Sequence, residues 1–177
     1  SGSSKILKSM NRKYTAEEFL LMVDKIKESK KEPFLSSDLI LGFPGETDND
    51  FEETQNTLKK ADFSYIHVFA FSPRPGTKAF SMLPKIPERI RDERVSIVTS
   101  MVKNLTVDYA NKFIDKVLNV LIERKIDDFF SGKSENYLEV RIKTNLNLLP
   151  KEIYQVKVES VNQDGSVEIR SGGTNYV

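Results

Sequence analysis

The segment from Ser37 to Phe71 most constrains the fold of this chain. Ser37–Phe43 is a continuous apolar run rather than an alternating one, which is typical of a strand covered on both faces of a parallel sheet. Thr47 opens a helix to about Ala61, and Phe63–Phe71 is rich in aromatic and β-branched residues. A strand–helix–strand order folds by default as a right-handed parallel unit. The sequence therefore predicts an α/β fold with parallel strands.

Helical patterns flank this unit on both sides. Thr15 and Glu18 have the Thr-x-x-Glu spacing of a capping box, which predicts a helix over Ala16–Ser29. Pro87 suits a first helical turn, and apolar residues keep helical spacing from there to about Phe113. The αβαβ order extends the parallel pattern. We expect a first domain over residues 1–113.

The hydrophobic pattern of the sequence changes after Phe113. Short runs with partial alternation are separated by turn signals, which is typical of a small antiparallel β-barrel or a sandwich. We expect this second domain over residues 114–177, with Ser131-Gly132-Lys133 as a connection, a hairpin turn at Asn162–Gly165, and a frayed end at Ser171–Gly173. The expected strands are Val117–Ile122, Tyr137–Ile142, Ile153–Val161 and Val167–Arg170.

Composition excludes several classes of protein. The 177 residues contain no cysteine and one histidine, so this chain alone forms no disulfide, zinc finger, iron–sulfur site or thiolate nucleophile. The 27 Lys and Arg nearly balance the 26 Asp and Glu, which argues against RNA binding through a large basic field. No apolar run is long enough for a membrane span, and no secretory leader opens the chain. We expect a cytoplasmic protein.

Two loops are candidates for a site. Gly42–Thr47 and Ser72–Thr77 each follow a predicted strand, and parallel strands place their carboxyl ends on one edge, where α/β active sites are built. Glu46, Asp48 and Asp50 carry negative charge there, which favours a cationic or zwitterionic ligand over a phosphate. The alternative is that the glycines and prolines of both loops only form turns and bind no ligand.

Other candidate residues have equally plain alternatives. His67 lies within a strand, where a packed histidine is more common than a catalytic one. Arg12, taken alone, is typical of a charged side chain exposed to solvent. A patch of basic, amide and aromatic side chains in the second domain is typical of an RNA-binding surface. The alternative, a solvent-exposed strand and turn with no binding role, is at least as plausible. The patch consists of Lys133, Asn136, Tyr137 and Arg141.

A set of short motifs occurs along the chain in one order. The set resembles the C-terminal half of the radical S-adenosylmethionine methylthiotransferases, over nearly the whole chain. The β-rich tail with Ser131–Tyr137 resembles their terminal RNA-binding barrel, the OB-like TRAM domain. The motifs are Ser1-Gly2-Ser3, Met10-Asn11-Arg12-Lys13-Tyr14-Thr15, Asp38-x-Ile40-x-Gly42-Phe43-Pro44-Gly45-Glu46-Thr47, Phe51 with Thr54, His67-Val68-Phe69, and Ser72-Pro73-Arg74-Pro75-Gly76-Thr77.

The resemblance implies a partial TIM-like barrel that binds S-adenosylmethionine across its strand ends. It places Ser1 and Ser3 near the amino-acid end of that cofactor, and Arg12 at its carboxylate. Further residues would line the adenine from two sides, namely Ile40 and Gly42 on one and Phe71 and Ser72 on the other. The family also uses two 4Fe-4S clusters and acts on the anticodon stem-loop of tRNA or on a ribosomal protein. The motifs most resemble the branch that modifies threonylcarbamoyladenosine.

The sequence departs from the family in lacking its cluster-binding cysteines and the first strands of the barrel. The expectation is a fragment that is inactive alone, requires the N-terminal part of the same protein, and self-associates through an open sheet edge. Three alternatives remain: a non-catalytic RNA-binding module, the isopentenyladenosine branch, and the ribosomal-protein branch.

Overall fold

The computed structural model describes residues 1–170, so the expected frayed end at Ser171–Gly173 lies outside the described residues. The chain divides into two compact units, Ser1–Val102 and Lys103–Val177. The division falls within a long helix, α5 (Glu88–Asn111), rather than after it at residue 113. The expected boundary between residues 113 and 114 stays a prediction. Each unit is described by itself.

The first unit is built on two parallel strands joined by a helix. Strands β1 (Ser36–Leu41) and β2 (Tyr65–Ala70) pair in parallel, with Asp38 opposite His67, and α3 (Asp48–Ala61) connects them. This confirms the predicted strand–helix–strand unit. Leu39, Leu41 and Ile66 are buried on the face of the sheet that the helices cover.

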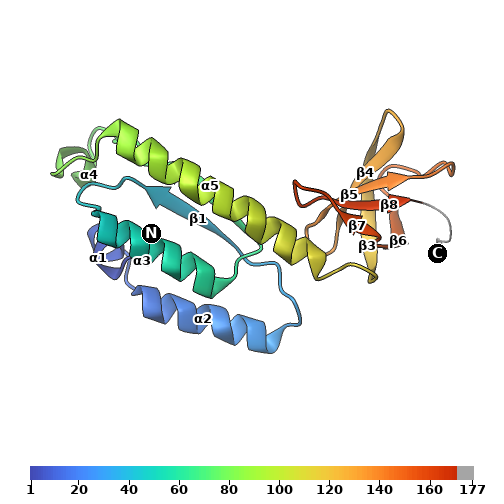
Figure 1. Ribbon diagram of the computed structural model, residues 1–177, viewed down its shortest axis with the longest axis horizontal. Coiled ribbons are helices and arrows are strands. Elements are labelled where there is room, and N and C mark those ends of the chain that lie inside the picture. The colour runs from blue at the N-terminus through green and yellow to red at the C-terminus, as the bar shows by residue number, and fades with distance from the viewer. Residues whose placement is uncertain (171–177) are drawn as a thin grey trace. The chain divides into compact units, whose positions relative to one another are not determined.

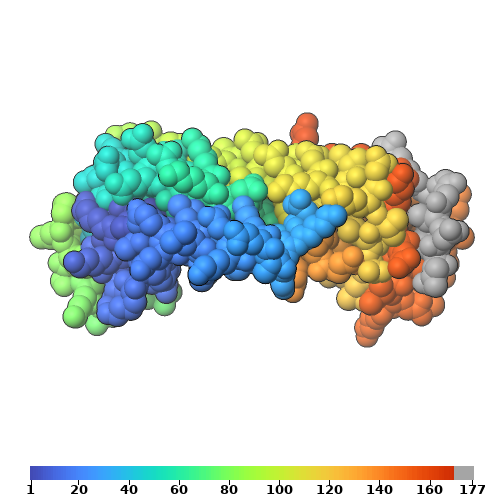
Figure 2. Space-filling view, turned by 90° about the horizontal axis from the view of Figure 1, so that it is seen from below, coloured from blue at the N-terminus to red at the C-terminus, as the bar shows by residue number. Residues whose placement is uncertain are grey.

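Helices α2 (Ala16–Ser29) and α3 lie side by side in this unit (Figures 1 and 2). The capping box at Thr15 and Glu18 is present, and α2 has the predicted bounds. Two short helices, α1 (Ser4–Ser9) and α4 (Lys78–Ser81), were not predicted. Neither has a side-chain cap, so the sequence signal that marks α2 and α3 is missing from both.

The second unit contains a curled six-stranded sheet in the order β6-β3-β4-β5-β8-β7. The two strands at the ends of this order are consecutive in the chain and only Val158 and Glu159 separate them, so one bent segment forms both edges. The strands are β3 (Val117–Ile126), β4 (Phe129–Ser134), β5 (Glu139–Lys143), β6 (Ile153–Lys157), β7 (Ser160–Val161) and β8 (Val167–Arg170).

This sheet corrects two expectations. It is not wholly antiparallel, because β5 and β8 pair in parallel while the other neighbours run antiparallel. Ser131-Gly132-Lys133 is not a connection but the middle of β4, where Gly132 pairs with Ile122 and Val140. The predicted hairpin between β7 and β8 is confirmed, and Gly165 closes its turn by donating its amide to the Asn162 carbonyl over 2.9 Å.

Alternation along these strands places their apolar side chains inside the curled sheet. Every second residue of β3 and β5 is buried at its centre, as the period of two along a strand requires. The fully buried side chains of this unit include Val120, Ile122, Val140, Ile142, Val156 and Ile169. Over the described residues, no helix is both long and apolar enough to cross a membrane.

Candidate functional site

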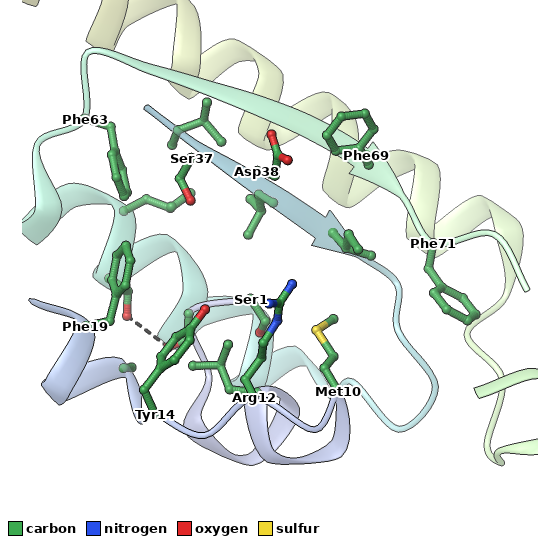
Figure 3. Close-up of a pocket in the computed structure, with 18 of the residues that line it drawn as sticks. Ser1, Met10, Arg12, Tyr14, Phe19, Ser37, Asp38, Phe63, Phe69 and Phe71 are labelled. Carbon is green, nitrogen blue, oxygen red and sulfur yellow. Dashed lines mark hydrogen bonds between the residues drawn. The ribbon is translucent and has the colours of Figure 1, made fainter. Parts of the chain in front are cut away.

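A cavity of about 560 Å³ lies in the first unit, beside β1 (Figure 3). Its walls come from the chain start, α1, the loop between α1 and α2, α2, α3 and the segment after it, both strands and the residues after β2. Five of the seven residues that the resemblance assigned to the cofactor line it: Ser1, Arg12, Ile40, Phe71 and Ser72. Ser3 and Gly42 are not among the lining residues.

Arg12 supplies a positive charge at this cavity. Its backbone amide donates to the Leu7 carbonyl over 2.9 Å, which fixes the turn after α1, and its exposed side chain extends toward the strands (Figure 3). Within residues 1–170 the guanidinium forms no ion pair. An exposed cation at an apolar cavity suits an anionic ligand group better than a buried, paired arginine would.

The other walls of the cavity are mostly apolar. Phe19 and Phe63 pack with ring centroids 6.0 Å apart at one end. At the other end Phe71 packs edge-on against Phe43 at 5.1 Å, and its amide donates to the Leu41 carbonyl over 2.8 Å. These contacts hold the rings in place, and a concave, mostly apolar cavity with few polar groups is typical of a small-molecule site.

Asp38 is a site residue that reasoning from the sequence did not assign. It lies in the middle of β1, is exposed, lines the cavity, and forms no ion pair within the described part of the chain. Phe69 of β2 was missed in the same way. The available signal was the charge of Asp38 directly before the apolar residues Leu39, Ile40 and Leu41 of the strand. The sequence pattern placed candidate residues at the ends of the strands, whereas Asp38 lies within one.

Ser3, which the resemblance placed near the amino-acid end of the cofactor, lies behind the cavity lining in a polar cluster. Its side chain is fully buried, and its hydroxyl donates to Asp50 over 2.8 Å. The same carboxylate accepts bonds from Lys5 over 2.6 Å and from the Thr47 hydroxyl over 2.6 Å. Burial alone would raise the pKa of Asp50, but these hydrogen bonds outweigh it and lower the pKa far below its usual range.

Gly42 belongs to a second polar cluster, centred on Glu46. The Gly42 amide donates to Glu46 Oε1 over 3.1 Å, and Arg94 of α5 donates to the same oxygen over 2.7 Å. The other terminal nitrogen of Arg94 donates to Asp48 over 2.6 Å. Glu46 and Arg94 are both buried, with side chains 0% and 6% exposed.

These two clusters correct the charge argument made for the loop after β1. Glu46 and Asp48 share Arg94, and Asp50 is paired with Lys5, so each of the three carboxylates already has a cation partner within the first unit. None of the three lines the cavity. The charged side chains that do line the cavity are Arg12, Asp38 and Arg74, and any preference for a zwitterion comes from them.

The candidate RNA-binding residues lie in the second unit, on and between β4 and β5. Lys133 pairs with Glu139 at 3.0 Å, and its hydrogen bond to that carboxylate raises the pKa of Lys133. Arg141 pairs with Asp164 at 2.6 Å. Each cation of the patch is thus matched by a carboxylate, which weakens its attraction for phosphate.

The two uncharged members of that patch lie in the turn between β4 and β5. Asn136 accepts a hydrogen bond from the Ser134 hydroxyl over 2.6 Å, which orders the turn. Tyr137 has a φ of 64° and is 64% exposed, so its ring is presented to solvent. In this patch Tyr137 is therefore the member best placed to contact a partner.

Residues 1–170 contain no group of three or more His, Cys, Asp or Glu side chains that could hold a metal ion. The whole sequence contains no cysteine. Iron–sulfur clusters are held mainly by cysteine thiolates. The residues of this chain therefore do not fit an iron–sulfur cluster, while those at the cavity fit the organic part of a nucleoside cofactor.

Comparison with known proteins gives similarities along almost the whole chain. Residues 1–58 match the family described as the Radical SAM superfamily. The threonylcarbamoyladenosine tRNA methylthiotransferase MtaB of Thermotoga maritima is 36% identical over 172 residues, 97% of this chain and 39% of that protein. The tRNA-2-methylthio-N(6)-dimethylallyladenosine synthase of Aquifex aeolicus is 38% identical over 158 residues, 89% of this chain and 36% of that protein.

The MtaB protein of Bacillus subtilis is 36% identical over 163 residues, 89% of this chain and 36% of that protein. Relatives of both kinds thus match at nearly equal identity, so identity does not separate their substrates. The chain spans about two fifths of the length of these relatives. It is therefore similar to radical SAM tRNA methylthiotransferases over nearly all of its own length.

Proposed function

We propose that this chain is the C-terminal part of a radical SAM enzyme that adds a methylthio group to a modified adenosine of tRNA. The observation that carries the proposal is the cavity beside β1, because Arg12 and Asp38, which form no ion pair within residues 1–170, meet an apolar wall there. The similarity to tRNA methylthiotransferases over 97% of the chain supports it. Such an enzyme acts in the cytoplasm.

In this proposal the cavity holds S-adenosylmethionine. Arg12 binds the carboxylate of the amino-acid end, and Ser1 lies near that end. Ile40 and Phe71 hold the adenine between apolar surfaces, with Ser72 at its rim. Ser3 and Gly42 support these residues indirectly through Asp50 and Glu46. When bound, the cofactor supplies the radical and the methyl group, and this chain binds and orients it.

The proposed enzyme needs two 4Fe-4S clusters, whose ligands are not in this sequence, since it has no cysteine. They would belong to an N-terminal part of the same protein. The chain alone is then expected to bind cofactor without catalysing methylthiolation. A non-catalytic RNA-binding module is the alternative, and the two differ in whether S-adenosylmethionine binds.

The specific substrate that we propose is threonylcarbamoyladenosine beside the anticodon. The motifs Met10–Thr15 and Ser72–Thr77 favour this branch, and MtaB proteins are among the relatives. The dimethylallyladenosine branch is the closest competitor. Mass spectrometry of tRNA from a strain lacking the gene distinguishes them: loss of the methylthio group from threonylcarbamoyladenosine is expected, and loss from dimethylallyladenosine alone would reject the branch.

In this proposal the second unit is a TRAM-like domain that contacts the anticodon stem-loop through Tyr137 and the neighbouring Asn136. The pairing of Lys133 and Arg141 with carboxylates makes a strong contribution from the backbone phosphates unexpected. Affinity of this chain for an anticodon stem-loop should therefore fall only gently with salt. A steep salt dependence would instead indicate that both cations leave their partners.

The cofactor proposal is tested by titrating S-adenosylmethionine into the chain and measuring heat. The expected result is binding that weakens at least about tenfold in Arg12→Gln, because a charge-assisted pair with the carboxylate is lost. Arg89→Gln is the matched control, since Arg89 is 83% exposed on α5 and does not line the cavity. Absence of binding to the unaltered chain, or equal binding by both variants, would reject the cofactor site.

We also propose that the chain self-associates through its first unit. In residues 1–170, β1 and β2 form a two-stranded sheet, so each strand has one edge with no strand paired to it. Such edges pair readily with other strands. Light scattering should therefore show a dimer at high concentration. A monomer at all concentrations would reject the idea.

A further inference from the structure

Strand β2 carries a row of three rings on one face of the sheet. Tyr65 and His67 meet edge-on with centroids 4.8 Å apart, and His67 and Phe69 lie 6.5 Å apart with planes inclined by 27°. Alternate residues of a strand share a face, so the three rings form a continuous ladder. The ladder is defined here as Tyr65, His67 and Phe69.

The ladder is open to solvent over residues 1–170. Tyr65 is 37% exposed and Phe69 is 49% exposed, although large aromatic side chains contribute most to stability when they are buried. The residues of β1 opposite the ladder are Ser36, Asp38 and Ile40. Two of these, Ser36 and Asp38, are polar and exposed, so β1 does not cover the rings.

The ladder is continuous with the cavity. Phe69 belongs to both, and Asp38, opposite His67, also lines the cavity. Figure 3 shows Phe69 on β2 near Asp38, with Arg12 reaching toward the same strands from the α1–α2 loop. A ligand on the rings would therefore have a carboxylate acceptor beside it and a cation across the cavity.

We propose that the ladder is a stacking platform for the base of the RNA nucleoside that the proposed enzyme modifies. This inference rests on the proposed function and names the place where its substrate binds. Aromatic rings stack on splayed-out RNA bases, and an exposed carboxylate accepts a hydrogen bond from an N–H group at the edge of a base. Arg74 also lines the cavity and is not used by the proposed cofactor, and such a cation suits the carboxylate or phosphate of a nucleotide.

The base on the ladder is distinct from the adenine of the cofactor. The two sites adjoin where Ile40, a proposed cofactor contact, is paired with Phe69, and from there the ladder extends away from the cofactor to Tyr65 at the start of β2. Two adenine-containing ligands could then occupy the same face together. This arrangement is what transfer of a group from a cofactor to a base requires.

The single histidine of the chain makes the proposal testable. The imidazole C–H protons of His67 give signals that can be assigned by proton NMR without ambiguity, and a base stacked nearby shifts them through its ring current. A single-stranded oligoriboadenylate should shift these signals. Ribose 5-phosphate, which has no base, should not, and neither should S-adenosylmethionine alone.

Variants identify the ladder as the source of binding. Phe69→Leu keeps an apolar side chain and removes the ring, so affinity for the oligoriboadenylate should fall about fivefold or more. Phe80→Leu is the matched control, because Phe80 is 43% exposed in the same unit and does not line the cavity. It should bind as the unaltered chain does.

Three results would overturn the platform. One is the absence of any RNA-specific effect: the oligoriboadenylate leaves the His67 signals unshifted, or it binds Phe69→Leu as tightly as the unaltered chain. Another is that S-adenosylmethionine alone shifts the His67 signals as much as the oligoriboadenylate does, which would show that the cofactor binds at the ladder. The last is a shift that depends only on protein concentration, which would show a second copy covering the rings.

Failure of the platform is distinguishable from failure of the proposed function. If tRNA from the deletion strain loses its methylthio group while the His67 signals never respond to RNA, the enzyme assignment stands and the platform is rejected. If that tRNA is unchanged, the enzyme assignment itself is rejected, whatever the NMR result.

Discussion

The loops that follow β1 and β2 have similar sequences and opposite environments. Both contain glycine and proline, and both end in a threonine that begins a helix. In Gly42–Thr47, Gly42, Phe43, Pro44 and Glu46 are buried, while every residue of Ser72–Thr77 is exposed. A loop at the carboxyl end of a strand can thus be either part of the scaffold or part of the open rim.

The first loop has a buried partner that the second lacks, Arg94 of α5. It donates to the Glu46 side chain and backbone carbonyl and to Asp48, and its guanidinium lies 5.3 Å from the Phe51 ring. The hydrogen bonds within Ser72–Thr77 run from the amide and hydroxyl of Thr77 to the Arg74 carbonyl. The first loop should therefore govern stability, and the second should govern only contacts with ligands.

The largest expected effect is that of Arg94→Met. The variant leaves Glu46 buried without its cation, so the free energy of unfolding of the first unit should fall by about 3–5 kcal/mol. Urea unfolding followed by circular dichroism measures this. Arg74→Met in the exposed loop should change it by less than about 0.5 kcal/mol. Equal losses for the two variants would erase the distinction between the loops.

Asp50→Asn should have the next largest effect, about 2–3 kcal/mol, because its carboxylate accepts bonds from Ser3, Lys5 and Thr47. The lowered pKa also sets a pH dependence. Asp50 stabilises the folded state above its unfolded pKa of about 4, and this stabilisation is lost as pH falls further toward the folded pKa. Unfolding at a series of pH values should show a smaller acid loss in the variant; an identical acid profile would refute this role.

Gly42→Ala and Gly76→Ala make a matched pair. Both glycines have left-handed backbones, with φ of 76° and 83°, so each alanine should cost about 1 kcal/mol in unfolding free energy. A Cβ at Gly42 would also collide with the Arg91 side chain, whereas nothing lies within 4 Å at Gly76. Thermal unfolding should therefore show that Gly42→Ala lowers the unfolding free energy by about 1 kcal/mol more than Gly76→Ala does. Equal melting temperatures would contradict it.

The smallest effects should come from the threonines that end the loops. Thr47 caps α3 by accepting from the Asp50 amide over 3.2 Å, while Thr77 makes no such bond at α4. Thr47→Ala should lower the unfolding free energy by about 1 kcal/mol, and Thr77→Ala by less than about 0.5 kcal/mol. The comparison would be broken by a larger loss at Thr77 in the same urea titration.

Local signals predicted the elements that carry them. The capping boxes at Thr15 and Thr47 mark α2 and α3, and both helices have the expected starts. The strand containing Gly132 was missed because Ser-Gly-Lys is typical of a turn. Gly132 stands in β4 for a tertiary reason, since a Cβ there would meet the Leu121 carbonyl of the neighbouring strand.

The site was predictable only in part, for a similar reason. The motif pattern indicated Arg12, Ile40 and Phe71, and the structure brings them to one cavity. The sequence could not show that the acids after β1 have cation partners, because Arg94 lies 48 positions from Glu46. Nor could it show that the rings of β2 stay uncovered, since exposure depends on which residues of β1 face them.

The bend between β6 and β7 has a consequence for how the second unit folds. The segment 153–161 pairs with β3 at one end and with β8 at the other, so it joins the two edges of the sheet. Pairing of β5 with β8 joins Val140 to Val167, contacts that are distant along the chain and costly in loop entropy. Assembly of this unit should therefore be slower than that of a sheet built only from hairpins between neighbouring strands.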